Sequence, residues 1–87
     1  CNGSGRILSK DTVIMRIYRW LNRSDYFIKD KNLRITVNPD LLNHINQHNE
    51  DFTAYKEQIE FTSDPSIRID QFKVYLLPGL EDITSMF

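Results

Sequence analysis

Apolar residues recur at spacings of three and four between about residue 9 and Arg23, which predicts an amphipathic helix. The apolar face of this helix comprises Val13, Ile14, Ile17, Tyr18, Trp20 and Leu21. Arg16, Arg19 and Arg23 fall on its other side. Ser9 or Asp11 can cap the first turn, because a side-chain oxygen there can accept a hydrogen bond from a free backbone N–H.

A strand pattern runs directly into a helix start at residues 33–42. Leu33, Ile35 and Val37 alternate with polar residues, which is the two-residue period of a half-buried strand. Asn38 can then accept hydrogen bonds from the next helix, and Pro39 suits its first position. We expect this second helix to persist to about residue 49, with a possible continuation toward residue 55.

A second alternating strand is predicted at residues 58–62, with Ile59 and Phe61 facing the core. The segment Ser63–Ser66 indicates a turn, because Asp64 can bond a nearby N–H and Pro65 presets its own φ. Alternation resumes at residues 67–69 and could extend the strand beyond this turn.

A third strand is predicted at residues 72–76, and Pro78-Gly79 after it predicts a type II turn with a positive φ at the glycine. Residues 80–84 then return as a fourth strand or begin a short helix, and the strand is preferred. The expected fold class is α+β: a small three- to four-stranded sheet with two helices packed on one face, in the order α-β-α-β-β with a possible further β.

The composition is that of one small globular domain: 87 residues, 40% hydrophobic, 26% charged and a net charge of −1. Residues 1–8 are expected to be a flexible leader or a cloning remnant, and residues 9–87 a single domain taken from a longer protein. The one cysteine, Cys1, rules out an internal disulfide. No apolar run approaches the roughly 20 residues of a membrane span, so a cytoplasmic protein is expected.

Metal binding and catalysis are not expected. His44 and His48 are four apart on the second predicted helix, but zinc would need a third ligand, for which Asp51 is the nearest candidate. No glycine-rich phosphate loop, nucleophile elbow or Cys-x-x-Cys motif occurs. The sequence therefore predicts a non-enzymatic protein with no cofactor.

Nucleic-acid binding is the alternative. The order of the elements is also typical of a winged helix, and the three arginines of the first helix could contact phosphates. The helix after Pro39, however, would be the reader of a duplex, and the first lysine or arginine after it is Lys56. For that reason a partner protein is preferred over nucleic acid.

Apolar and aromatic residues exceed what one small core can hold, which favours docking on a partner. The residues concerned are Tyr18, Trp20, Tyr26, Phe27, Tyr75, Leu77, Leu80, Met86 and Phe87. The candidate partner-binding residues are chosen by their expected surface position. They are Arg16, Arg19 and Arg23 as a charged face, with Leu77, Leu80 and Phe87 as an apolar edge. Asn38, Pro39, Asp64 and Pro65 are interpreted as structural corners.

Two short motifs carry a resemblance to a known family. Ile35-Thr-Val-Asn-Pro-Asp-Leu-Leu42 and Ile59-Glu-Phe-Thr-Ser-Asp-Pro-Ser-Ile67 resemble, in order and spacing, motifs of the C-terminal domain of FliH/YscL-type proteins. These proteins regulate the ATPase of flagellar and virulence type III secretion systems. Phe72–Leu76 and Asp82–Ser85 match the rest of that pattern loosely.

The resemblance implies a cytoplasmic subunit, located at or near the inner membrane, that forms a homodimer in the full-length protein. It would dock the secretion ATPase onto a sorting-platform or ring protein, with no nucleic acid among its partners and no membrane insertion.

Overall fold

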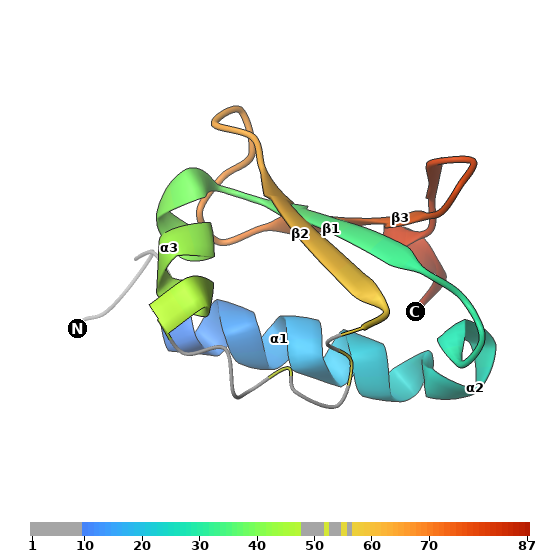
Figure 1. Ribbon diagram of the computed structural model, residues 1–87. Coiled ribbons are helices and arrows are strands. Elements are labelled where there is room, and N and C mark those ends of the chain that lie inside the picture. The colour runs from blue at the N-terminus through green and yellow to red at the C-terminus, as the bar shows by residue number, and fades with distance from the viewer. Residues whose placement is uncertain (1–9, 48–51, 53–54, 56) are drawn as a thin grey trace.

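The computed structural model describes residues 10–47, 52, 55 and 57–87, and it shows one sheet with helices against one of its faces (Figure 1). The elements in chain order are α1 (Lys10–Arg23), α2 (Asp25–Ile28), β1 (Leu33–Val37), α3 (Pro39–Gln47), β2 (Ile59–Ser63), β3 (Phe72–Leu76), β4 (Glu81–Asp82) and the 3₁₀ helix η2 (Thr84–Met86). The α+β class, with a four-stranded sheet and the main helices on one face, is confirmed.

The sheet has the order β2-β1-β3-β4, so β1 occupies an interior position. It pairs with β2 in parallel, with α3 in the crossover between them, and with β3 in antiparallel orientation. Because the crossover connects two parallel neighbours, α3 is carried back over the sheet. Leu33, Ile35 and Val37 of β1 point to the helix side and are fully buried.

The first helix packs the predicted apolar face onto that sheet. Five of its six predicted face residues are buried, and Tyr18 is half-buried. Ser24 ends α1 by donating its hydroxyl hydrogen to the carbonyl oxygens of Trp20, at 2.9 Å, and Leu21, at 3.2 Å. These bonds satisfy carbonyls that a helix end leaves free. The short helix α2 follows at once and buries Ile28; the sequence pattern did not predict it.

The two predicted corners contact one another. The Asp40 N–H donates to Asn38 Oδ1 at 2.9 Å, which caps α3 as expected. The Asn38 side-chain amide also donates to the carbonyl oxygen of Ile67 at 2.9 Å, and the Asp64 N–H donates to the carbonyl oxygen of Val37 at 2.9 Å. Residues 64–67 therefore fold back on the β1–α3 corner, and no strand continues through residues 67–69.

Three predictions fall partly outside the described residues. These are the leader at 1–8 with the Ser9 cap, the continuation of α3 past residue 47, and a ligand role for His48 and Asp51. Within the described part, Phe52 and Tyr55 are buried in the main core.

The β3–β4 connection differs from the predicted turn. The Leu77–Pro78 peptide bond is cis, and the positive φ, 56°, is at Leu80 instead of Gly79. After it the chain forms both alternatives, a two-residue strand β4 and then η2. The residue with the left-handed backbone is thus a leucine, for which this conformation costs about 1–2 kcal/mol.

Relief of this backbone cost gives a stability prediction. The Leu80→Gly variant should be more stable than Leu80→Ala by roughly 1 kcal/mol, because both lose the same apolar contacts and only alanine retains a Cβ at positive φ. Urea titration of both variants, followed by circular dichroism, measures the difference. Equal midpoints in the two variants would contradict it.

Candidate functional site

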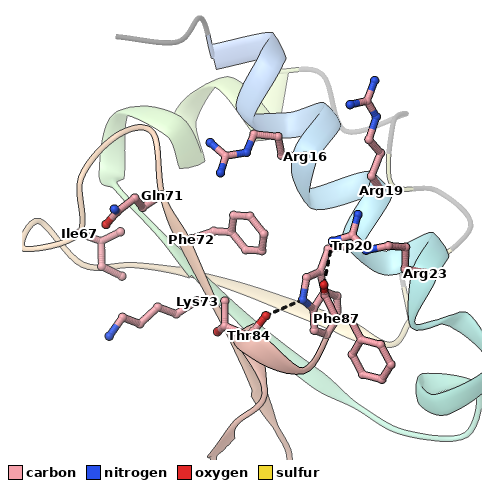
Figure 2. A pocket seen from close by; sticks show the side chains of 10 residues that line it. All are labelled: Arg16, Arg19, Trp20, Arg23, Ile67, Gln71, Phe72, Lys73, Thr84 and Phe87. Carbon is pink, nitrogen blue, oxygen red and sulfur yellow. Dashed lines mark hydrogen bonds between the residues drawn. The ribbon is translucent and has the colours of Figure 1, made fainter. Parts of the chain in front are cut away.

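A groove of about 440 Å³ lies between α1 and the C-terminal segment (Figure 2). Its lining residues are Arg16, Arg19, Trp20, Arg23, Ile67, Gln71, Phe72, Lys73, Thr84 and Phe87. They come from three regions of the chain: α1, the segment leading into β3, and the segment from η2 to Phe87. The groove is therefore a product of tertiary packing.

Hydrogen bonds from Trp20 and Thr84 hold the C-terminal wall of the groove. The indole N–H of Trp20 donates to the carbonyl oxygen of Thr84 at 2.9 Å. The Thr84 hydroxyl oxygen accepts a bond from the Val74 N–H at 2.7 Å, which joins η2 to β3. Phe87 then packs its ring against Trp20 and Phe27, with ring centroids 5.5 and 5.4 Å away. These contacts hold Phe87 against α1, next to Arg23.

The groove is positively charged. Arg16, Arg19 and Arg23 are all exposed, and none of the described residues that line the groove is acidic. Arg23 donates to the main-chain oxygen of Phe87 at 3.1 Å, and Arg16 to that of Asp70 at 3.4 Å. The Arg16 bond goes to an uncharged peptide carbonyl group, so it does not pair this guanidinium with a carboxylate.

The fourth basic residue, Lys73, contributes at the edge of the groove. In β3 it alternates with Phe72 and Val74, and Figure 2 shows its side chain directed away from the arginines. Asp82 lies near this lysine, but hydrogen bonds from the Thr84 N–H and hydroxyl are the main cause of its lowered pKa, and the Lys73 charge lowers it further. Asp64 likewise has a lowered pKa, mainly through bonds from Ser66.

The structure divides five of the six predicted partner-binding residues between two places, and Leu77 lines neither of them. Four of these residues line the groove between α1 and the C-terminal segment, which we call the arginine groove: Arg16, Arg19, Arg23 and Phe87. Leu80, which is 48% exposed, instead lines a second hollow of about 410 Å³ together with Arg34 and Tyr75. That hollow lies on the sheet face away from the helices, because Arg34 alternates with buried β1 residues. Phe87 and Leu80 therefore do not form one apolar edge.

Gln71, Lys73 and Thr84 were missed as groove residues. Their spacing carries no periodic signal, and only the packing of β3 and the C-terminal segment near α1 brings them into the lining of one groove. Of the corner residues, Asp64 and Pro65 line the second hollow, whereas Asn38 and Pro39 line neither of the two.

The described residues include no group of three or more His, Cys, Asp or Glu side chains that could hold a metal ion. His44 lies 2.8 Å from the Asp11 carboxylate, measured from Nε2 to Oδ1, so α3 is joined to α1 at this point. No helix within the described ranges is long and apolar enough to cross a bilayer.

Comparison with known proteins gives one match. A family model described as "Initiator Replication protein, WH1" matches residues 4–69, which is more than half of the chain. Neither the curated proteins nor the solved structures include a match.

This match contradicts the resemblance to FliH/YscL-type proteins and the secretion function that the resemblance implied. Type III secretion, the docking of a secretion ATPase onto a platform or ring protein, and the exclusion of nucleic acid are all wrong. The physical reason lies in the two motifs. Asn38-Pro39 is a helix cap and Asp64-Pro65-Ser66 is a turn in which the Ser66 N–H donates to Asp64 Oδ1 at 2.9 Å.

Such caps and turns arise wherever a chain needs a strand-to-helix corner or a tight turn, so they occur in unrelated families. The family match extends over the helix, strand and crossover that carry both corners, and is not confined to them. The chain belongs to the initiator replication protein WH1 family.

Proposed function

We propose that this chain is a DNA-binding domain of a replication initiator, and that Arg16, Arg19 and Arg23 bind DNA phosphates at the arginine groove. The observation that carries the proposal is the convergence of these three exposed arginines on one groove without an acidic neighbour among its described lining residues. Family membership supplies the biological setting, since a replication initiator acts on DNA.

The position of the charge explains why α3 is not the proposed contact. Between Pro39 and Gln47 this helix carries no lysine or arginine, and His44 faces Asp11. A helix without fixed positive charge gains little from the phosphate backbone, which dominates DNA affinity. The expectation against nucleic acid rested on the lack of charge in α3 and on the family resemblance, whereas three of the basic residues gather on α1.

Local charge matters more here than the total. The net charge is only −1, so the whole domain has no long-range attraction for DNA. Three guanidinium groups on one helix face still create a positive potential at the groove, and each can form paired hydrogen bonds with a phosphate. The domain would thus work by binding, without catalysis, inside the cell where DNA is replicated.

The test is the salt dependence of DNA binding. Fluorescence anisotropy with labelled DNA should show log K falling linearly with log salt concentration, and Arg19→Gln should reduce the slope by about 0.7–0.9. Arg34→Gln is the matched control, because Arg34 pairs with Glu60 on the opposite sheet face, 2.7 Å away. A binding curve without a salt-sensitive component, or an equal effect of both variants, would overturn the proposal.

A further inference from the structure

We infer that the arginine groove takes single-stranded DNA in preference to duplex, with an unpaired base stacked on Tyr26. This inference rests on the proposed function and specifies the form of DNA that the site accepts. It combines the shape of the groove, an exposed aromatic ring at its end and the line of charges along α1.

The shape of the groove favours a thin ligand. Its walls are α1 on one side and residues 71–73 with Thr84 and Phe87 on the other, as Figure 2 shows. Duplex DNA is read by elements that project into its major groove, about 12 Å wide. Here the arginines lie along a concave site, so a duplex would touch only the rim, whereas one strand can lie inside.

The charges follow one line. Arg16, Arg19 and Arg23 are spaced by three and four residues on α1, so the row extends about 10 Å along the helix axis. A row of this length can contact neighbouring phosphates of a single strand. Proteins that bind single strands without sequence preference combine such a basic track with aromatic side chains on which bases stack.

Tyr26 supplies an exposed aromatic surface at the Phe87 end of the groove. It is 78% exposed, the highest value among the large hydrophobic residues that the structure describes. Its ring lies 6.1 Å from that of Phe87, at 83° between the ring planes, and Phe87 is in turn held against Trp20 and Phe27. A solvent-exposed ring beside packed aromatic rings offers a free face on which a base can stack.

Gln71 adds a polar group that does not by itself select a DNA base sequence. It is exposed on the wall opposite the arginines, and its amide can both donate to and accept from a base edge. The groove therefore offers phosphate and base-edge contacts, and Tyr26 offers a ring beside Phe87.

The chain contains its own reporter of groove occupancy. Trp20 is its only tryptophan and lines the groove. An oligothymidylate of about 12 nucleotides should change the Trp20 emission and bind about tenfold more tightly than a duplex of the same length. Anisotropy with the labelled oligonucleotides measures both affinities on the intact chain.

The Tyr26→Ala variant should weaken oligothymidylate binding by about tenfold, the effect of removing one stacked base contact, and leave duplex binding unchanged. Tyr26→Phe should retain the binding, since the ring remains. Tyr75→Ala on the opposite sheet face is the matched control, and circular dichroism checks that each variant is folded.

The outcomes separate the two levels of the argument. Duplex binding as tight as oligothymidylate binding, a Trp20 emission that does not respond, or equal effects of Tyr26→Ala on both ligands would overturn the inference and leave the proposed function standing. Failure to bind either DNA at low salt would remove both.

Discussion

Replacement of Arg16, Arg19 and Arg23 together by glutamine is expected to remove most of the DNA affinity, about a hundredfold or more at low salt. Each arginine that contacts a phosphate releases counterions, so the salt slope should also fall by about 2–3. Glutamine keeps the length and helix propensity of the side chain, and all three positions are exposed, so the fold should be retained. Anisotropy titrations at several salt concentrations measure both quantities.

The control must lose the same total charge elsewhere. Lys10, Lys29 and Arg34 are basic residues outside the groove, and their joint replacement by glutamine changes the net charge equally. This control should keep nearly the original slope. If both triple variants lose affinity to the same extent, the binding reflects overall charge and the arginine groove is not the DNA site.

Trp20→Ala is expected to destabilise the domain by about 3–5 kcal/mol. Trp20 is 2% exposed, and its loss leaves a cavity beneath the C-terminal segment as well as removing the bond to the Thr84 carbonyl. Native domains have about 5–15 kcal/mol of stability in total, so a substantial unfolded fraction should result. Urea unfolding followed by far-UV circular dichroism measures this.

Two further variants separate the causes. Trp20→Phe keeps an aromatic ring but loses the indole N–H, so it should cost about 1–2 kcal/mol for the lost bond and the smaller ring. Met15→Ala lies on the same helix at a position that is 48% exposed, and it should change stability by less than about 0.5 kcal/mol. A Trp20→Ala midpoint equal to that of Met15→Ala would contradict the structural role of Trp20.

Local patterns predicted most of the elements. The strand at 33–37 and the helix beginning at Pro39 coincide with β1 and α3, because alternation and capping depend on near neighbours in the chain. The predicted second and third strands agree with β2 and β3 to within one residue. Where distant contacts decide, prediction failed: α2 depends on burial of Ser24 and Ile28, and residues 64–67 fold onto Asn38 instead of continuing a strand.

The arginines were recognised as a charged helix face, whereas the expected partner of the protein, a secretion ATPase, was wrong. The surplus of aromatic residues favoured protein docking, and in the structure part of that surplus is internal. Trp20 is buried, and Phe27 and Phe87 pack together beside it. Composition does not show whether an aromatic side chain is buried in the core or exposed on the surface, so it could not distinguish core residues from docking residues.

By itself, the sequence determined the α+β class, the positions of the main helices and strands, and a helix with three arginines on its outer side. These features follow from periodicity and capping, which act over a few residues. Only the tertiary structure decided the mixed order of the strands and the return of Thr84 and Phe87 to α1, which forms the arginine groove. The contacts of Thr84 and Phe87 with α1 join residues more than sixty positions apart in the chain. They form because side chains in the core must pack closely and buried polar groups must find hydrogen-bond partners.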